Sequence, residues 1–566
     1  MRSQVVVGGV TAAVLAAGFG LAVTSPASAA GDTLIVDAAS SIRPVTHVAA
    51  GGLYAFADAS TPPDAVLKPL HLNTLTQPAP GVQQLGNGAT VPTGDALKVA
   101  AKVINSGAQQ YVRMPDIYPN FPYKWVSWDD WLAKVKTMVQ ARLAATDSTS
   151  IAGWELWNEP DWTWDTTAAG AFNTGWVRTY QAVRALDSAT PVVGPSISSY
   201  NHNFMSSFLT NAKANGALPN VVSWHAWSAS GMTADVADYR ALEKTLGIGP
   251  LPISLNEYAW TDEVDVPGVV VQYLAQVERL GVHDAERPYW YESGTVNGLL
   301  YNNQPTGTYW LYKWYGDMSG NMVAVTRGGT QDGAASYDST RKIVDVVFGG
   351  DSGSNTVQIK GLGNFGSSVK VTLSSTPNSG RKANVSAPTT ISTATYSVSN
   401  GTISVPVTGQ VAASGYQLVV TPATGPTTSW QQVYEAENAT VVNAQRLSAS
   451  TASNGGYVGR IDGTGDARTD SFVDFTVNVP TTGTYSMAVR YANGGTVTST
   501  QGLAYNGGAW STISYPVTGS WGAFGSTVST SLSLKAGYNV IRLAKGSPRF
   551  AGGTGYAELD SISLTP

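Results

Sequence analysis

The sequence predicts a (β/α)8 TIM barrel followed by an accessory β-sandwich and a C-terminal jelly-roll sandwich. Three observations support this fold class. Between about residues 46 and 318, short apolar runs alternate with longer segments of helical periodicity. From residue 321 the chain is rich in Val, Thr, Ser and Gly and shows short alternating runs, which are typical of β-sandwiches. The length of 566 residues is too great for one ordinary domain and suggests about three.

The first of these regions contains eight candidate strands, the number that a (β/α)8 barrel requires. They are Val48–Phe56, Leu72–Gln77, Gln110–Met114, Gly153–Glu159, Pro191–Pro195, Val221–Trp227, Pro252–Tyr258 and a strand near Pro288–Glu292. Six intervening segments have helical periodicity, namely Asp95–Ser106, Trp128–Ala145, Phe172–Leu186, Asn203–Asn215, Ala234–Leu246 and Gly268–Leu280.

Changes in composition mark the domain boundaries. We expect the barrel in residues 30–320, the accessory sandwich in 321–421 and the last sandwich in 430–566. Residues 422–429, rich in Pro and Thr, have the composition of a linker. The early apolar run Thr33–Asp37 predicts a strand that either precedes the barrel or joins the accessory sandwich.

Charge and composition exclude several function classes. The formal charge of −5 and the lack of a basic cluster argue against a nucleic-acid partner. The chain has no cysteine, so disulfides, thiolate metal sites and a cysteine nucleophile are all excluded. Beyond the N-terminus no segment approaches ~18 continuous apolar residues, so we expect no membrane span. The oligomeric state is left open.

Residues 1–29 have the pattern of a secretory signal peptide. Arg2 supplies the positive charge, Val5–Val23 is apolar, and Ala27–Ala29 forms an A-x-A cleavage pattern. A membrane anchor is the alternative, but the apolar stretch is short, rich in glycine and followed directly by the cleavage pattern. We therefore expect a secreted protein that begins near Ala30.

An apolar, aromatic run at Trp154–Asp161 ends in Asn-Glu-Pro. Pro160 cannot donate to a β-ladder, so the strand should end there. Successive side chains of a strand point to opposite faces, so we expect Glu155, Trp157 and Glu159 on one face. Glu159 would then project from the carboxyl end of its strand, where barrel enzymes place their chemistry.

A second run, Pro252–Tyr258, also ends in Asn-Glu. Ile253, Leu255 and Glu257 should share one face. About three strand–helix units separate the two glutamates, so we expect Glu257 at the same barrel end as Glu159. A single Asn-Glu-Pro could lie in any surface turn, but two strand-terminal Asn-Glu pairs favour paired carboxylates.

Paired carboxylates at a barrel mouth suit cleavage of a glycosidic bond, since one can act as a protonated acid while the other stays ionised. Sugars present apolar C–H faces that stack on aromatic rings, although each ring could equally be ordinary packing. The aromatic residues near the two strand ends are Trp162, Trp164, Tyr258, Trp260, Tyr289 and Trp290.

Other polar residues near strand ends are candidates for the same site, each with a structural alternative. His225 could orient the nucleophile or simply line the barrel. Arg113 could keep Glu257 ionised or pair internally with Glu155. Weaker candidates are the rival carboxylate Glu292, which lacks a preceding Asn, and two residues near other strand ends, His47 and Asp116.

The motifs at 157–160 and 256–258 resemble those of glycoside hydrolase clan A, and their details look closest to family 39. In that clan the carboxylates follow barrel strands four and seven, and the reaction retains the anomeric configuration. The resemblance implies that Glu159 is the acid/base, Glu257 the nucleophile and Asn158 a partner of the sugar 2-hydroxyl.

This resemblance spans about residues 48–320 and implies a glycoside hydrolase that acts on arabinose- and galactose-containing side chains of arabinogalactan. A β-xylosidase is the alternative within the class, and an inactive carbohydrate-binding protein is the alternative outside it. The clan often has His-x-Tyr after strand six, where this chain has Trp227 in place of Tyr; an indole donates but does not accept, so the Tyr role is in doubt. The expected substrate-binding residues are Asn158, His225, Arg113, Trp227, Tyr258, Trp260 and Trp290.

The last domain resembles carbohydrate-binding modules of families 35 and 6 at residues 432–439 and 557–562. In those modules, first-strand glutamates and a last-strand aspartate hold a structural calcium, which requires several oxygen ligands. The resemblance implies Glu435, Glu437 and Asp560 as ligands; exposed acids on edge strands are the alternative. No cofactor is expected for catalysis. The expected sugar contacts of this module are Tyr457, Asn493 and Trp521.

Overall fold

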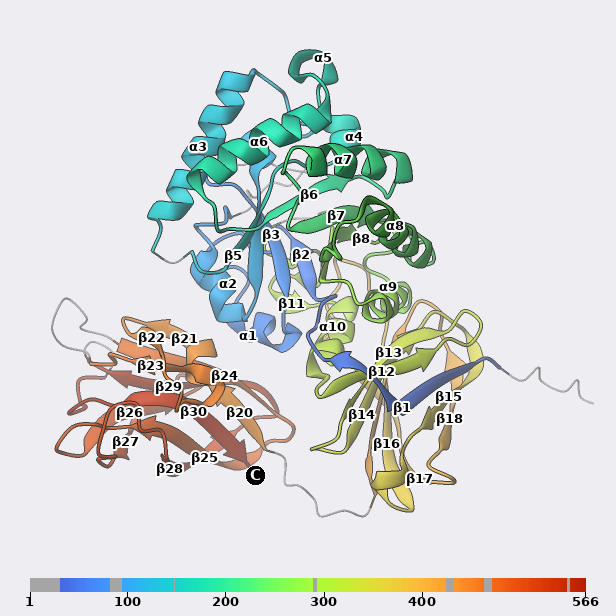
Figure 1. The fold of residues 1–566 in the computed structure, drawn as a ribbon. Helices are drawn as coiled ribbons and strands as arrows, with labels where there is room; N and C mark the ends of the chain where they lie inside the picture. The colour runs from blue at the N-terminus through green and yellow to red at the C-terminus, as the bar shows by residue number, and fades with distance from the viewer. Residues whose placement is uncertain are drawn as a thin grey trace, which may run out of the picture.

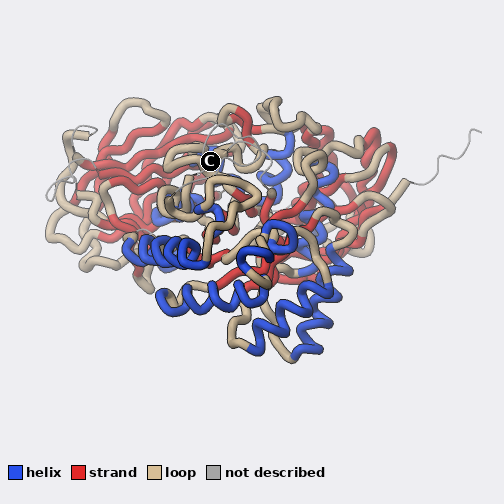
Figure 2. Tube along the Cα trace, turned by 90° about the horizontal axis from the view of Figure 1, so that it is seen from above, coloured by secondary structure: helices blue, strands red, loops and turns tan. Residues whose placement is uncertain are grey.

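The computed structural model describes residues 31–81, 94–146, 148–288, 293–423, 431–462, 471–546 and 550–566. The predicted signal peptide, most of the predicted linker and the candidates Tyr289, Trp290 and Glu292 lie outside these ranges. A barrel is followed by two β domains, which lie below it in Figure 1. Helices gather in the barrel, and strands dominate elsewhere (Figure 2). The predicted fold class is confirmed.

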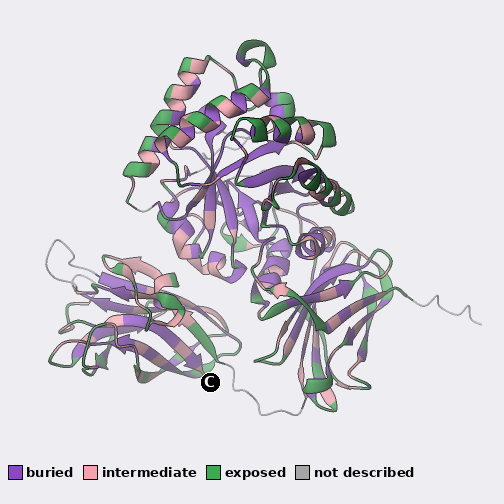
Figure 3. Ribbon diagram, in the orientation of Figure 1, coloured by how far each residue is buried: buried purple, intermediate pink, exposed green. Residues whose placement is uncertain are grey.

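Eight parallel strands close the barrel. They are β2 (Gly51–Leu53), β3 (Thr74–Pro78), β4 (Gln109–Arg113), β5 (Ile151–Glu155), β6 (Val192–Ile197), β7 (Val221–Ala226), β8 (Ile253–Tyr258) and β9 (Asp284–Arg287). The strands are buried along most of their length, whereas the surrounding helices alternate between buried and exposed positions (Figure 3). One continuous apolar core therefore fills the space between strands and helices.

The helices of the barrel are α1 (Asp64–Leu67), α2 (Ala100–Ser106), α3 (Trp128–Ala144), α4 (Pro160–Thr163), α5 (Thr166–Ala169), α6 (Phe172–Leu186), α7 (His202–Ala214), α8 (Met232–Leu246), α9 (Pro267–Leu280) and α10 (Gly307–Asp317). Six of them correspond to the predicted ranges, although the first of these six begins later than expected; the short helices α1, α4 and α5 and the last helix, α10, were not predicted. A small hairpin precedes α10, formed by β10 (Leu300–Tyr301) and β11 (Gln304–Pro305). No helix in the described ranges is long and apolar enough to cross a bilayer.

The eighth barrel strand, β9, lies earlier than predicted. We expected it near Pro288–Glu292, and this placement was wrong. Asp284 and Glu286 point into the barrel, where Tyr111 donates to Asp284 at 2.7 Å and Thr76 donates to Glu286 at 3.0 Å. A four-residue strand with three charged side chains has no apolar run, so hydrophobic periodicity does not reveal it.

The accessory sandwich is a nine-stranded sheet that folds around its own apolar core. Its first strand, β1 (Thr33–Pro44), precedes the barrel in sequence and pairs with strands that follow the barrel, antiparallel with β12 and parallel with β15. The other strands are β12 (Asn321–Thr326), β13 (Asp332–Asp338), β14 (Ile343–Gly349), β15 (Gly353–Lys360), β16 (Ser368–Thr376), β17 (Thr389–Ser397), β18 (Ile403–Gln410) and β19 (Gly415–Pro422).

The C-terminal domain is a sandwich of two antiparallel sheets around a separate core. One sheet contains β20 (Gln432–Glu435), β22 (Gln445–Ser448), β23 (Gly456–Gly459), β25 (Gly483–Ala492), β28 (Ser526–Leu534) and β30 (Glu558–Thr565). The other contains β21 (Thr440–Val442), β24 (Ser471–Val479), β26 (Ser499–Tyr505), β27 (Ser511–Tyr515) and β29 (Gly537–Lys545).

The C-terminal domain contacts the barrel directly. Thr440 donates to Asp64 at 2.7 Å, Lys68 donates to the carbonyl of Asn438, and Arg446 donates to Asn105. The barrel residues in these contacts precede β3 and β4, so the domain lies against the amino-terminal ends of the strands. A cavity of about 660 Å³ lies where the barrel and both β domains meet.

Glu286 is a fully buried acid inside the barrel, below the carboxyl ends of the strands. Burial raises its pKa well above the usual range, and the charges of Asp284 and Glu155 raise it further. Its Oε2 atom has no hydrogen-bond partner among the described residues. A carboxylate in this position would be costly, so the folded protein holds Glu286 in its neutral form.

The variant Glu286→Gln should therefore change the pH dependence of stability. Since the folded-state pKa is raised, Glu286 costs no stability below its unfolded-state pKa of about 4.3, and it destabilises the fold increasingly as pH rises from that value to the folded-state pKa. We expect similar melting temperatures at about pH 4 and a higher melting temperature for the variant at pH 9, by roughly 1 kcal/mol or more in unfolding free energy.

Glu243→Gln is the matched control for this experiment. Glu243 is equally buried but accepts from Arg240 at 2.6 Å, so its neutralisation should destabilise the protein at both pH values. A Glu286→Gln variant that is less stable than the parent at pH 9 would contradict the neutral state of Glu286.

Candidate active site

Glu159 lies beyond its strand rather than on it. Strand β5 ends at Glu155, and Glu159 adopts a left-handed conformation (φ 50°) at the start of α4. Its backbone N–H donates to the carbonyl of Ser196 at 2.8 Å, which fixes the turn to β6. We expected Glu155, Trp157 and Glu159 on one face of a strand, and this was wrong, because the strand and its alternation end at Glu155, four residues before Glu159. Glu155 lies inside the barrel, while Glu159 reaches the mouth.

Glu257 is redirected by an irregularity in β8. The pairing with β7 shifts register between Ser254 and Glu257. As a result, the consecutive residues Asn256 and Glu257 both contact polar side chains of the barrel interior, while Leu255 packs in the apolar core. The expected common face of Leu255 and Glu257 was wrong. Bulges often turn a side chain toward a site in this way.

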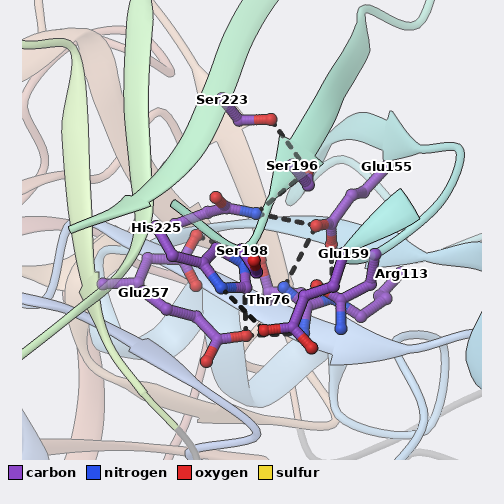
Figure 4. Close-up of polar contacts among 12 residues, drawn as sticks. Thr76, Arg113, Glu155, Glu159, Ser196, Ser198, Ser223, His225 and Glu257 are labelled. Atoms are coloured by element: carbon purple, nitrogen blue, oxygen red, sulfur yellow. Dashed lines mark hydrogen bonds and ion pairs between the residues drawn. The ribbon is translucent and has the colours of Figure 1, made fainter. Parts of the chain in front are cut away.

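Arg113, at the end of β4, connects the two layers of this site. Its Nε and one terminal nitrogen donate to Glu155 at 2.7 and 3.0 Å, and the other terminal nitrogen donates to Glu257 at 2.9 Å (Figure 4). Asn256 also donates to Glu155, at 2.7 Å. Both interactions considered for Arg113 thus exist together. Glu155 and Asn256 are supporting residues that the sequence did not single out as such.

His225 lies between the two catalytic candidates. Its Nδ1 is 3.2 Å from Glu159 and its Nε2 is 3.5 Å from Glu257 (Figure 4). The ring is fully buried, and neither nitrogen makes a regular hydrogen bond to a described residue. One small ring in contact with both carboxylates places Glu159 and Glu257 on the same side of the barrel mouth.

The charges of this cluster shift the pKa of each member. Burial lowers the pKa of His225, but the carboxylates of Glu257 and Glu159 raise it more, so the net shift is upward. Burial raises the pKa of Glu257, and this exceeds the lowering by His225 and Arg113. Burial also raises the pKa of Glu159, but His225 and Arg113 lower it overall. In the free protein, Glu159 is therefore the more readily ionised carboxyl.

The other expected substrate contacts divide into accessible and buried residues. Trp260 is about half exposed, and its ring lies 5.0 Å from that of Trp227. Asn158 is beside Glu159, and its Oδ1 has no partner within the described ranges. Tyr258 is completely buried and donates to the carbonyl of Ala49 at 2.9 Å, so its assignment to substrate binding was wrong.

Two weaker candidates have structural partners. His47 is half-buried beside His71, with ring centroids 5.1 Å apart, before β2 and thus at the opposite end of the barrel. Asp116 is buried and accepts from Tyr54 and Tyr123, so these hydroxyls cover its carboxyl. Burial raises the pKa of Asp116 to about 7. Both residues serve the packing of the barrel.

The expected sugar contacts of the C-terminal domain differ in character. Trp521 is about half exposed, and Tyr457 packs against Phe524 with ring centroids 5.0 Å apart. Asn493 is buried; its side chain donates to the carbonyls of Val497 and Tyr515 at 3.0 and 2.9 Å. It holds a loop together, so its assignment to sugar binding was wrong.

Two of the three expected calcium ligands, Glu435 and Asp560, approach one hydroxyl, that of Ser453. Its Oγ lies 2.7 Å from Glu435 and 2.9 Å from Asp560, yet a hydroxyl can donate only one proton. Glu437 has a buried Oε2 with no partner in the described part of the chain, which also fits a cation. Arg490, however, forms an ion pair with Asp560. The described residues contain no group of three His, Cys, Asp or Glu side chains placed to hold a metal by themselves.

Comparison with known proteins gives results for both halves of the chain. Residues 432–566 match the model of the carbohydrate binding module (family 35). A 3-O-β-L-arabinopyranosyl-α-L-arabinofuranosidase of Bifidobacterium pseudocatenulatum is 26% identical over 82% of this chain and 56% of its own length. A 3-O-α-D-galactosyl-α-L-arabinofuranosidase of Bifidobacterium longum subsp. longum is 26% identical over 86% and 50%. The chain thus spans about half the length of these relatives.

The solved structure of N2152 from Neocallimastix frontalis is 34% identical to this chain. The alignment covers 69% of this chain and all of N2152, with a TM-score of 0.66. This chain belongs to the family of N2152. The glucosidase of Croceicoccus marinus shares the fold at 12% identity, with a TM-score of 0.54. The narrower placement in family 39 remains a prediction.

Two variants of the C-terminal domain separate its surface from its core. Trp521→Ala removes an exposed ring and should weaken binding to polysaccharide by roughly thirtyfold, the loss expected for an aromatic anchor, without changing the melting temperature. Asn493→Ala removes buried hydrogen bonds and should cost roughly 1–3 kcal/mol of stability. Affinity electrophoresis in polysaccharide gels and calorimetric melting measure the two effects. Unchanged binding by Trp521→Ala would exclude this ring from the sugar site.

Proposed function

We propose that this chain is a secreted, retaining glycoside hydrolase that cleaves α-L-arabinofuranosyl bonds in arabinose- and galactose-containing side chains of arabinogalactan. The observation that carries the proposal is the pairing of Glu159 and Glu257 at the carboxyl end of a barrel, with His225 between them and Arg113 bound to one. Secretion is proposed from the signal-like pattern of residues 1–29.

In this mechanism Glu257 attacks the anomeric carbon and forms a glycosyl ester, while Glu159 protonates the leaving oxygen. In the second step Glu159 removes a proton from water, whose oxygen displaces Glu257 from the sugar. Arg113 supports this assignment, since its hydrogen bond at 2.9 Å favours the ionised form of Glu257 that attack requires.

The acid role requires a proton on Glu159, although His225 and Arg113 lower the pKa of this carboxyl in the free protein. Glu159 is the more exposed of the two carboxylates, so a bound sugar would remove water from it and raise its pKa. His225, 3.2 Å away and with a raised pKa, is placed to supply the proton. Burial raises the pKa of Glu257 in the free site, so its role as nucleophile depends on Arg113 and His225, which favour its ionised form.

The substrate proposal rests on the names of the two bifidobacterial relatives. Both names describe arabinofuranosidases that act on an arabinofuranoside substituted at O3, one by arabinopyranose and one by galactose. We extend this specificity to the present chain as the class to be tested first. A C-terminal domain that matches a carbohydrate binding module is consistent with a polymeric substrate.

Azide rescue tests the assignment of the two carboxylates. Glu257→Ala should lose at least about a thousandfold in turnover of every substrate, because no ester can form. Glu159→Ala should retain more activity on aryl α-L-arabinofuranosides, whose leaving groups need little protonation. Added azide should accelerate Glu159→Ala and yield a glycosyl azide of the substrate's own configuration.

With Glu257→Ala, azide should replace the nucleophile and yield the opposite configuration. Proton NMR of the glycosyl azide distinguishes the two products. Exchanged behaviour of the two variants would reverse the assignment. If neither substitution reduced turnover by more than about tenfold, the catalytic site would lie elsewhere.

We further propose that Glu435, Glu437 and Asp560, with backbone carbonyls, bind a structural calcium in the C-terminal domain. Chelation of the full-length protein should then lower the melting temperature of that domain, and calcium should restore it, since a ligand of the folded state alone stabilises by mass action. Glu437→Gln should respond less to calcium. Elemental analysis that finds no calcium, together with melting that is insensitive to chelation, would refute the site.

A further inference from the structure

Two exposed aromatic rings lie on the Glu159 side of the barrel mouth. Phe121 and Trp162 are 40% and 53% exposed, although large apolar side chains are usually covered. Their rings meet edge to face, with centroids 5.4 Å apart and planes at 89°. They come from different loops, those that follow β4 and β5, so the fold brings them together at one place.

Buried aromatic residues support this exposed pair. Phe121 packs on Tyr123 with centroids 5.4 Å apart, and Tyr123 packs on Trp157 at 5.3 Å. Trp157 in turn contacts Trp164 at 4.7 Å and donates to Thr163. The supporting rings are almost completely buried. The exposed pair is therefore held in place before any ligand binds, which reduces the entropic cost of binding.

The position of Trp162 relative to Glu159 identifies the side of the cleft. Both residues belong to one turn, in which the backbone N–H of Trp162 donates to the carbonyl of Glu159 at 3.1 Å. The nearby Trp162 side chain also contributes to the lowered pKa of the Glu159 carboxyl. An acid catalyst must touch the leaving oxygen. A ring beside this acid therefore lies beside the leaving group.

We propose that Phe121 and Trp162 form the binding platform for the leaving-group sugar, and for an acceptor sugar in the second step. The ligand class is a pyranose or furanose with an exposed apolar C–H face, such as the galactose backbone of the substrate. This proposal rests on the proposed function. Trp227 and Trp260 lie beside His225, with ring contacts of 5.4 Å and 5.0 Å in the series His225–Trp227–Trp260, and in this proposal they contact the sugar that forms the ester.

The platform has a chemical consequence for the second step. The ester between Glu257 and the sugar is broken by a hydroxyl oxygen, either of water or of a sugar on the platform. The new bond joins that oxygen to the anomeric carbon, the hydroxyl proton passes to Glu159, and Glu257 leaves as a carboxylate. A sugar bound to Phe121 and Trp162 thus competes with water and gives a transfer product.

The ratio of transfer product to free arabinose tests this platform. Both products arise from the same glycosyl ester, so the ratio is independent of the first step and of its leaving group. With p-nitrophenyl α-L-arabinofuranoside as donor and methyl β-galactoside as acceptor, Phe121→Ala should lower the ratio at least fivefold. Trp162→Phe keeps a ring but removes the N–H donor, so its ratio of transfer product to free arabinose should stay close to that of the parent.

Trp260→Ala is the matched variant at an exposed ring outside the platform, and it should raise KM for the donor while preserving the ratio. The proposal would be overturned if the ratio of transfer product to free arabinose fell in Trp260→Ala but not in Phe121→Ala. Phe121 is exposed, so its substitution should leave the melting temperature within about 2 °C of the parent.

A binding measurement separates failure of the platform from failure of the proposed function. In Glu257→Gln, calorimetric titration with β-galacto-oligosaccharide should give at least tenfold weaker binding when Phe121→Ala is added. If the parent released no nitrophenol either from this donor or from one substituted at O3, the proposed function would fail, and this titration would still decide the platform. Equal affinity with and without the Phe121 ring would overturn it.

Discussion

The guanidinium of Arg113 is the interaction on which the rest of the site depends. It is buried in the barrel and binds Glu155 on one side and Glu257 on the other. A buried charge is tolerated only when it is paired and hydrogen-bonded, and removal of one partner commonly costs about 3–5 kcal/mol. Glu155 neutralises Arg113, and Asn256 completes the bonds of Glu155. The reactive carboxylate is thereby fixed by a network of buried side chains inside the barrel.

Sequence patterns predict the barrel and its two carboxylates because both depend on local signals. Apolar runs that end in Asn-Glu mark strand ends, and strand ends meet at one mouth. The patterns fail where the backbone departs from regularity. The left-handed turn at Glu159 and the register shift before Glu257 depend on tertiary contacts with β6 and β7, which periodicity cannot represent. The prediction of β9 failed for a different reason. Its charged side chains face the barrel interior, so the strand contains no apolar run that the pattern could detect.

Burial decides which of the predicted side chains can meet a ligand, and residue type does not reveal burial. Tyr258 and Trp260 are two residues apart, yet one is sealed in the barrel wall and the other is half exposed. Asn493 and Trp521 differ in the same way in the C-terminal domain. Phe121 was not predicted, because its loop has no strand-end motif. A search for aromatic residues in every loop after a barrel strand would have found it.

The accessory sandwich also contacts a loop beside the cleft through a side chain. Arg381, from the loop after β16, donates to the carbonyl of Thr261 at 3.1 Å and lies 3.3 Å from Asp265. These residues belong to the loop that carries Trp260. The C-terminal domain instead contacts the opposite end of the barrel, through Asn105 and residues near it. The accessory sandwich therefore contacts a loop at the carboxyl ends of the barrel strands, beside the cleft. The C-terminal domain contacts the amino-terminal ends of the strands.

The position of β1 in the sequence affects the order in which the domains can fold. This strand is synthesised before the barrel, whereas its neighbours β12 and β15 are synthesised after it. Its edges stay without partners while about 280 further residues are synthesised. Unpaired edges invite wrong pairing between chains. The exposed second half of β1, with Ser40 and Ser41 in place of apolar residues, makes such pairing less favourable during that interval. The barrel can then close before the sandwich takes up its first strand.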